Sequence, residues 1–185
     1  MMTEISLNIL DVAQNSVRAE ASLIEITVDI NTAEDRLEIV IKDDGCGMTP
    51  EQLESVTDPF FTTRTTRSIG LGIPFFKQSA ELTGGSFGIK SEVGVGTETR
   101  AVYVLSSIDR MPLGNMTQTI HSLVTMNTHI NFLYTYSADG KSFTLDTREF
   151  KEILGEDADF ASPDVSYFIM DYLTENHAEV SDLAE

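Results

Sequence analysis

The chain has 185 residues, of which 41% are hydrophobic and 23% are charged, with a formal net charge of −18 and a single cysteine. This length and composition predict one globular domain, or one with a small appendage, rather than a disordered chain. The acidic balance argues against nucleic acid as a partner, because nucleic-acid affinity comes from basic groups that neutralise phosphates. One cysteine excludes an internal disulfide and a cysteine-rich zinc site.

No apolar run in the sequence approaches the roughly 20 residues that a membrane-spanning helix needs. The start also lacks the basic segment of a signal peptide, so we predict a cytoplasmic protein without membrane contact. No Lys or Arg follows Lys151, whereas acidic residues continue to the end of the chain. This acidic end is interpreted either as a tail that docks on a basic partner or as a solvated helix face with a frayed terminus.

Periodicity along the first 105 residues predicts a unit that contains both helices and strands. Apolar residues recur at helical spacing near the start, and two apolar–polar alternations follow that are typical of half-buried strands. Pro74 suits the first turn of a later helix, and Gly84-Gly85 provides its end. The expected elements are a helix at 4–18, strands at 23–30 and 37–41, a helix at 74–82, and strands at 86–91 and 97–105.

The composition changes near Ser106-Ser107, where we predict a boundary between a domain at 1–105 and a small α+β unit at 106–185. Within the second unit, Asp139-Gly140 between two apolar runs predicts a tight hairpin turn. The expected elements are a short helix at 116–124, strands at 132–136 and 142–145, and a helix at 147–154 that ends at Gly155.

A final helix is predicted from Ser162 as its N-cap and Pro163 in its first turn. Its apolar residues recur near helical spacing, so one side should face the core. The side chains that we expect to be buried there are Val165, Phe168, Ile169 and Tyr172.

Three clusters of polar residues within the first 97 residues suggest chemistry. The first lies on the first predicted helix, where Asp11 and Asn15 are four residues apart and share a face, with Arg18 one turn further. A carboxylate, an amide and a guanidinium on one stripe could hold a hydrated Mg²⁺ and a phosphate. The alternative is a polar helix face with ordinary side-chain pairs.

The second cluster, Asp43-Asp44-Gly45-Cys46-Gly47-Met48, follows a predicted strand. One interpretation is a simple turn. The other is that its glycines let the backbone approach a planar ligand closely, while one carboxylate accepts a hydrogen bond from an exocyclic amine of that ligand.

The third cluster runs from Asp58 to Pro74 and contains hydroxyl groups, two arginines and a Gly-x-Gly at a predicted helix start. A helix N-terminus offers free N–H groups and a positive dipole end, which favour phosphate. The Rossmann and Walker patterns are both absent, because their glycines do not occur at the required spacing after a strand.

Taken together and in this order, the clusters resemble the sequence boxes of the GHKL superfamily of ATP-binding proteins. That superfamily contains histidine kinases, gyrase-type and mismatch-repair ATPases, the large heat-shock chaperone and anti-sigma kinases. The resemblance covers about residues 1–105. The matching segments are Asp11 to Arg18 (N box), Asp43-Asp44-Gly45-Cys46-Gly47 (G1 box), Asp58-Pro59-Phe60-Phe61-Thr62-Thr63-Arg64 (F box), Gly70-Leu71-Gly72 (G2 box) and Gly94-Val95-Gly96-Thr97 before the closing strand.

The resemblance implies an α+β fold, a two-layer α/β sandwich in which a mixed sheet has helices on one face and ATP with Mg²⁺ binds beneath a lid. It implies that Asn15 is the metal ligand and that Asp43 accepts a hydrogen bond from the adenine amino group. Arg18 and Arg64 would supply positive charge to the phosphates. The other implied cofactor-binding residues are Gly45, Gly47, Met48, Phe60, Thr63, Gly70, Leu71, Gly72 and Thr97.

The short lid, 62–69, and the Pro-Phe-Phe-Thr-Thr stretch are more similar to histidine kinases than to the DNA ATPases. We therefore predict a stand-alone bacterial signal-transduction kinase that phosphorylates a protein regulator in trans. An alternative is a slow ATPase switch in which Asp11 is the catalytic base, and a third is a module that binds ATP without turnover. The phosphoacceptor, the input signal and the oligomeric state, including a homodimer, are left open.

Overall fold

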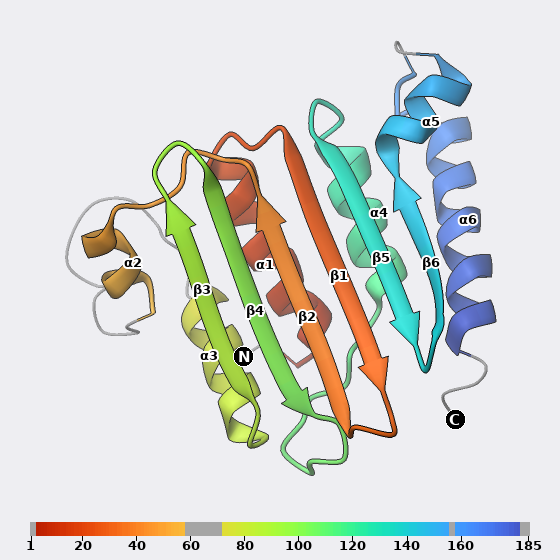
Figure 1. The fold of residues 1–185 in the computed structure, drawn as a ribbon. Helices are drawn as coiled ribbons and strands as arrows, with labels where there is room; N and C mark the ends of the chain where they lie inside the picture. The colour runs from red at the N-terminus through yellow and green to blue at the C-terminus, as the bar shows by residue number, and fades with distance from the viewer. Residues whose placement is uncertain (1–2, 58–71, 156–157, 182–185) are drawn as a thin grey trace.

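The computed structural model describes residues 3–57, 72–155 and 158–181 of the chain. Its strands form one mixed sheet in the order β3-β4-β2-β1-β5-β6 (Figure 1). The strands are β1 Leu23–Asn31, β2 Arg36–Asp43, β3 Ser86–Glu92, β4 Gly96–Val104, β5 Asn131–Ala138 and β6 Lys141–Asp146. The helices are α1 Ile5–Arg18, α2 Pro50–Val56, α3 Gly72–Leu82, α4 Met116–Met126, α5 Thr147–Leu154 and α6 Pro163–Ser181.

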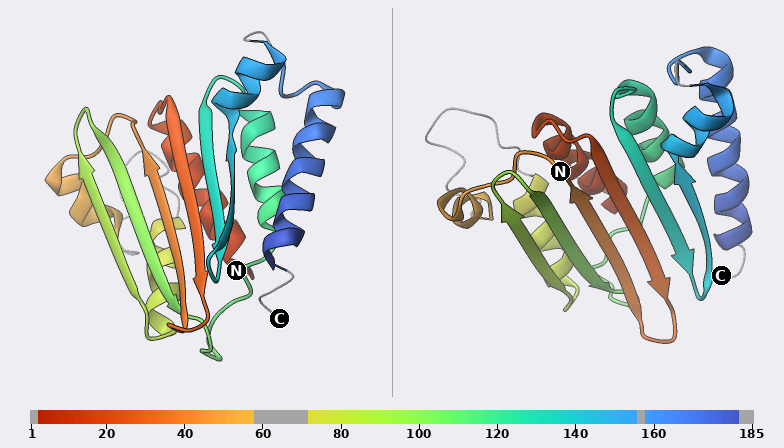
Figure 2. Two further views of the ribbon diagram at one scale, coloured as in Figure 1. Left: turned by 45° about the vertical axis from the view of Figure 1, so that its right-hand side comes forward. Right: turned by 45° about the horizontal axis from the view of Figure 1, so that its top comes forward.

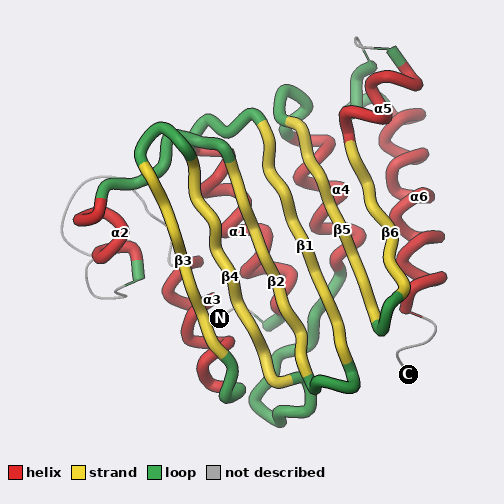
Figure 3. The backbone as a smooth tube through the Cα atoms, in the orientation of Figure 1, coloured by secondary structure: helices red, strands yellow, loops and turns green. Residues whose placement is uncertain are grey.

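Helices α1, α3, α4 and α6 lie side by side against one face of the sheet, which makes two layers (Figures 2 and 3). The predicted two-layer α+β architecture is therefore confirmed. Among the described helices, none combines the length and the apolar character that crossing a bilayer requires.

The C-terminal strands continue the sheet of the first half. β5 runs parallel to β1, in register from Leu23 opposite Asn131 to Ile30 opposite Ala138. β6 then pairs with β5 in the antiparallel sense. The boundary at 105 thus separates sequence segments that share one sheet, and a separate role for residues 106–185 stays a prediction.

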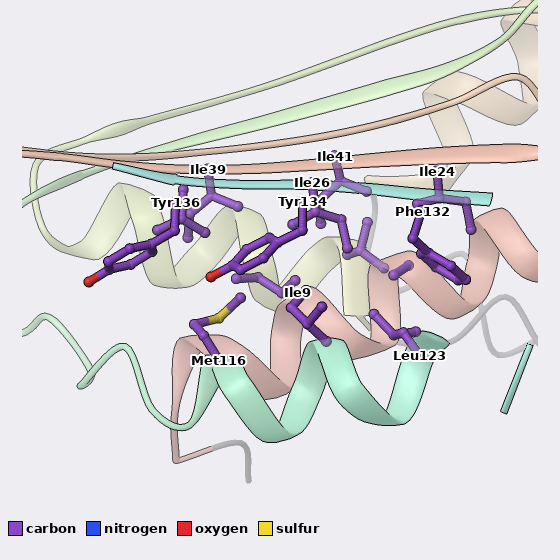
Figure 4. Close-up of a cluster of buried hydrophobic side chains, with 14 of the residues drawn as sticks. Ile9, Ile24, Ile26, Ile39, Ile41, Met116, Leu123, Phe132, Tyr134 and Tyr136 are labelled. Atoms are coloured by element: carbon purple, nitrogen blue, oxygen red, sulfur yellow. The ribbon is translucent and has the colours of Figure 1, made fainter. Parts of the chain in front are cut away.

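The core lies between the sheet and its helices and is shared by both halves of the chain. Alternate residues of β1 and β2 point into it, as the strand periodicity predicted, and their neighbours on β5 are three large aromatic residues (Figure 4). From the helix layer, Ile9 of α1 and Met116 and Leu123 of α4 close the same cluster (Figure 4). Ile24, Ile26, Ile39, Phe132 and Tyr134 are each no more than 2% exposed.

The predicted hairpin between β5 and β6 is confirmed. Ala138 pairs with Lys141, so the loop contains only Asp139 and Gly140. Both loop residues have positive φ, 48° and 86°, which is the geometry of the tight turn that matches strand twist.

Two predictions need correction. Helix α2 was not expected, although Thr49 caps it with a full capping box to Gln52 and Pro50 occupies its first turn. Phe168 of α6 was expected to be buried but is 52% exposed, because the buried side of this helix is formed by Ile169, Leu173 and Val180. The Phe168 ring instead packs edge-on against Phe150 of α5, with ring centroids 5.8 Å apart.

A half-buried histidine links α6 to the sheet and should make stability depend on pH. Nε2 of His177 lies 3.0 Å from the Tyr134 hydroxyl, and the imidazole packs on the Tyr136 ring at 3.9 Å between centroids. Burial lowers the pKa of His177 from 6.5 to about 4. The unfolded chain therefore binds a proton between pH 6.5 and 4 that the folded chain does not, so stability falls as the pH falls through that window.

We expect this histidine to contribute about 2 kcal/mol of lost stability between pH 7 and 4, after allowance for its partial exposure. The measurement is urea unfolding of the wild type and His177→Gln at both pH values. The variant should show a smaller loss on acidification. Equal losses in the two proteins would contradict the assignment.

Candidate functional site

A buried carboxylate lies at the end of β2. Asp43 is 9% exposed and faces α1 on the covered side of the sheet. Its Oδ2 accepts a hydrogen bond from Ser16 Oγ of α1 at 2.5 Å, and its Oδ1 accepts one from the Gly45 N–H at 2.9 Å. These two hydrogen bonds hold the carboxylate in one orientation. With the partners that the described residues provide, each oxygen keeps a lone pair and can accept a further hydrogen bond. Ser16 was not identified from the sequence, since only the fold brings it to Asp43.

Asp43 belongs to a polar row that crosses three strands. Thr97 of β4 is the register partner of Asp43, and Ser91 of β3 is the register partner of Thr97. The Oγ atoms of Ser91 and Thr97 lie 2.8 Å apart, and Ser91 Oγ also accepts the Met48 N–H at 2.8 Å. The row therefore joins the sheet to the loop that follows β2. Ser91 is a second residue that no sequence motif singled out.

The glycines of the loop after β2 allow close backbone packing within the protein. A Cβ on Gly45 would lie 2.8 Å from both Cβ and O of Ala19, at the end of α1. Gly47 has φ +68°, and a Cβ there would lie 1.9 Å from the Glu92 carbonyl oxygen. Backbone hydrogen bonds from Cys46 N–H to Ala19 O and from Gly94 N–H to Cys46 O, both 2.9 Å, fix the same loop. The loop is thus held between α1 and the β3–β4 turn.

The stripe predicted on the first helix is present on α1. Nη1 of Arg18 donates to Oδ1 of Asn15 at 2.8 Å. The Asn15 Nδ2 atom is buried and has no hydrogen-bond partner among the described residues. Ser16, the next residue, binds Asp43, so helix α1 carries both the Asn15–Arg18 pair and the contact to the buried carboxylate.

Asp11 lies one turn earlier, against the start of α3. A Cβ on Gly72 would lie 2.2 Å from Oδ2 of Asp11, so only a glycine fits beside this carboxylate in its present position. The structure therefore brings together Asp11 and Gly72, which the sequence placed in different boxes.

Buried polar contacts hold α1 and α3 together one turn before Asp11. Nδ2 of Asn8 lies 3.5 Å from Ser79 Oγ, which in turn lies 2.9 Å from the Tyr103 hydroxyl of β4. Asn8 is 1% exposed, and burial raises the pKa of Tyr103 above its ordinary value. A neutral network of this kind fixes the spacing of the two helices that carry Asp11 and Gly72.

Asp44, next to Asp43, is held differently. It accepts hydrogen bonds from the Ser22 N–H at 2.7 Å, the Ser22 hydroxyl at 2.5 Å and the Leu23 N–H at 2.9 Å. Partial burial acts to raise the pKa of Asp44, but these hydrogen bonds outweigh it and lower the pKa below its ordinary value. Asp44 thus secures the start of β1, whereas Asp43 faces the covered side.

Five of the predicted cofactor-binding residues lie outside the described part of the chain. They are Phe60, Thr63, Arg64, Gly70 and Leu71. Within the described ranges, no group of three or more His, Cys, Asp or Glu side chains could hold a metal ion.

A family model described as histidine kinase-, DNA gyrase B- and HSP90-like ATPase matches residues 2–107. The chain belongs to this ATPase family. ATP binding is the activity that this membership supports, and the matched segment contains the polar row and the α1 stripe.

Curated relatives of this ATPase domain include sensor proteins. A putative sensor protein of Shewanella frigidimarina is 31% identical over 107 residues, which are 57% of this chain and 16% of that protein. The sensor protein SrrB of Staphylococcus aureus is 39% identical over 101 residues, which are 52% of this chain and 17% of SrrB. The chain thus spans about a sixth of the length of these relatives.

Solved structures show the same fold. The Aquifex aeolicus MutL ATPase domain complexed with ADP superposes with a TM-score of 0.51 and 17% identity, over 83% of this chain and 70% of that one. The N-terminal domain of a DNA repair protein gives a TM-score of 0.54 and 14% identity, over 78% and 53%. Both shares of this chain exceed the family match, so the likeness in fold extends beyond residue 107.

Proposed function

We propose that this chain is a Mg-ATP-dependent protein kinase that transfers the γ-phosphate to a Ser, Thr or His side chain of a separate regulatory protein. The observation that carries the proposal is the Asp43–Ser16 hydrogen bond, which sets a buried acceptor beside the α1 stripe of Asn15 and Arg18. The identity with sensor proteins over the ATPase domain favours phosphate transfer in signalling. A cytoplasmic location remains part of this proposal.

ATP would bind with its base at the polar row and its phosphates towards α1 and the start of α3. Asp43 would accept a hydrogen bond from the exocyclic amine of adenine, with Thr97 beside it. Gly45, Gly47 and Met48 belong to the loop that borders this position. The phosphates would be bound by the third sequence cluster, which includes Thr63, Arg64, Gly70 and Gly72. Arg18 would bind them as well.

Asn15 fits a magnesium site that is completed by phosphates and water. Mg²⁺ keeps several waters and takes few protein ligands, so a three-carboxylate cluster is not required. The Asn15 amide has one buried nitrogen without a partner among the described residues, and its oxygen accepts from the Arg18 guanidinium. When bound, Mg²⁺ would neutralise charge on the phosphate oxygens. Arg18, released from Asn15, would then add positive charge to the same phosphates.

Catalysis of phosphoryl transfer depends mainly on the positions of the reacting groups and on stabilisation of their charge. The acceptor oxygen or nitrogen forms a bond to the γ-phosphorus, the bond to the β–γ bridging oxygen breaks, and ADP leaves with the electron pair, while the hydroxyl proton of a Ser or Thr acceptor passes to water. In this chain, Asp43 and Thr97 would orient the base, while Arg18 would stabilise charge that develops on the transferred phosphoryl group.

A second candidate function is a slow ATPase switch in which Asp11 is the general base. The specific observation is that its carboxylate lies against Gly72, at the first turn of α3, where a helix N-terminus favours phosphate. An aspartate there could act on water directly or through a second water.

Asn15→Ala and Asp11→Asn separate these two functions. With γ-labelled Mg-ATP, a kinase should label candidate regulators at a rate that falls at least about a hundredfold in Asn15→Ala and changes little in Asp11→Asn. An ATPase should release phosphate without a partner and lose this release in both variants. Gln14→Ala, an exposed position on the same helix, is the control for general damage to α1.

Calorimetric binding of ATP completes the experiment, because it separates a failure of chemistry from a failure of binding. A wild-type protein that bound no ATP would overturn both functions. Binding of ATP with neither phosphate release nor transfer to any regulator would contradict the kinase and the ATPase, and would favour a module that only senses the nucleotide.

A further inference from the structure

We propose that Ser91 is a positioning residue that aims the Thr97 hydroxyl proton at the nucleotide, so that the site prefers adenine over 6-oxopurines. The proposal rests on the nucleotide site proposed above and assigns to Ser91 the control of base specificity. Ser91 acts only through Thr97 and does not itself need to touch the base.

The contacts of Ser91 limit where its hydroxyl proton can go, although either hydroxyl of the Ser91–Thr97 pair can donate. Its Oγ atom uses one lone pair to accept the Met48 N–H at 2.8 Å. Its single proton can go to Thr97 Oγ1 at 2.8 Å or to the Gly96 carbonyl oxygen at 3.1 Å. The Ser91–Thr97 distance is the same whichever hydroxyl donates. Hydrogen bonds between hydroxyl donors and oxygen acceptors extend to about 3.0 Å, and the Gly96 contact at 3.1 Å lies just beyond this range, so we assign the Ser91 proton to Thr97. In the opposite arrangement Ser91 would donate to Gly96 O and Thr97 to Ser91, which would leave Thr97 no proton for a ligand.

This assignment leaves the Thr97 proton free. A hydroxyl carries one proton and two lone pairs, and Thr97 accepts from Ser91 with one lone pair. Its own proton can then donate to a ligand. If Ser91 were absent, the Thr97 proton could turn to the protein, and the hydroxyl would no longer be held as a donor.

Asp43 and Thr97 together form an acceptor beside a donor. They are direct register partners across the antiparallel strands β2 and β4, where facing residues lie about 4.5–5.5 Å apart. The Asp43 carboxylate can only accept while it is ionised, and both of its oxygens are anchored by Ser16 and Gly45.

The edge of adenine has the complementary pattern. Its 6-amino group donates and its N1 accepts, which matches Asp43 and Thr97 respectively. Hypoxanthine and guanine carry a 6-oxo acceptor and an N1–H donor, so both contacts are reversed. A site with fixed polarity rejects such an analogue because its buried polar groups are left unpaired.

The test compares ATP with ITP, which differs from ATP at this edge by the 6-oxo group and the N1–H. Dissociation constants for both nucleotides are measured by calorimetry with the wild type, Ser91→Ala and Ser91→Thr. We expect Ser91→Ala to lower the preference for ATP over ITP about tenfold, chiefly through weaker ATP binding. Ser91→Thr keeps the hydroxyl and should retain the preference. Ser86→Ala, an exposed serine on the same strand, is the matched control.

A double-mutant cycle with Thr97→Val tests whether Ser91 acts through the Thr97 hydroxyl. Removal of the Thr97 hydroxyl should lower the preference as Ser91→Ala does, and adding Ser91→Ala should then change it little. If Ser91→Ala unfolds the protein, Ser91→Cys replaces it, since a thiol keeps the volume but is a weak donor, and it should lose the preference too.

The outcomes separate this inference from the proposed function. An unchanged ATP-to-ITP ratio in Ser91→Ala, or equal losses for both nucleotides, would overturn the role of Ser91 while leaving ATP binding intact in the wild type. Additive effects of Ser91→Ala and Thr97→Val would overturn it as well. No binding of either nucleotide by the wild type would instead remove the proposed site.

Discussion

Asp43→Asn is expected to weaken ATP binding about ten- to a hundredfold, because a hydrogen bond to a charged acceptor is worth about 1.5–3 kcal/mol. Asparagine has nearly the same shape, but its amide nitrogen cannot accept a hydrogen bond. One of the two present contacts, from Ser16 Oγ or from the Gly45 N–H, would therefore lose its acceptor. Calorimetric titration with ATP gives the affinity, and circular dichroism checks that the fold is kept.

Asp44→Asn provides the matched control for this experiment. It is the same substitution at the next residue, on a carboxylate that accepts from Ser22 and Leu23. We expect a small loss of stability at the start of β1 and an unchanged ATP affinity. If Asp44→Asn weakened ATP binding as much as Asp43→Asn, the assignment of Asp43 to the base would be wrong.

Most of the fold could be predicted from the sequence because its signals are local. The alternation in β1 and β2 reports one buried face, and Asp139-Gly140 between strands requires the two-residue turn that the structure has. The capping box of Thr49 and Gln52 at α2 is an equally local signal that could have predicted this helix. Phe168 was misplaced for another reason: helical spacing identifies an apolar side but does not determine where its edge falls.

The site was predictable only in part, since its contacts depend on strand order. The motifs identified Asp43, Asn15 and Thr97 as separate positions. That Ser16 binds Asp43 follows from how α1 lies on the sheet, and that Ser91 reaches Thr97 follows from the register of β3 with β4. The first relation cannot be obtained from spacing along the chain, because it joins residues through the tertiary fold. The second joins two residues across the β3–β4 hairpin, so it required the register of that turn, which the sequence pattern did not fix.

The loop glycines show how one local signal can have two causes. The sequence suggested that Gly45 and Gly47 let the backbone approach a planar ligand. In the structure, both are required by the protein itself, because Ala19 and Glu92 occupy the space where their Cβ atoms would lie. This close packing sets the position of Met48, whose N–H binds Ser91.

Gly47→Ala is therefore expected to destabilise the fold by about 3 kcal/mol, and to weaken ATP binding as the loop moves. The residue has φ +68°, a conformation that costs an L side chain about 1–2 kcal/mol. The remainder comes from the contact of 1.9 Å with the Glu92 carbonyl oxygen, which is backbone in β3 and cannot rotate away. Urea unfolding measures the loss of stability.

Gly94→Ala separates the two causes of this effect. Gly94 has a similar φ of +78°, but no atom of the described residues lies within 4 Å of the position that an alanine methyl group would take there, so only the backbone strain of about 1–2 kcal/mol should appear. The difference between the two variants then measures the close approach of the loop to β3. Equal losses in Gly47→Ala and Gly94→Ala would mean that the loop can move away from Glu92 freely, and that its present position does not fix the polar row that includes Ser91, Thr97 and Asp43.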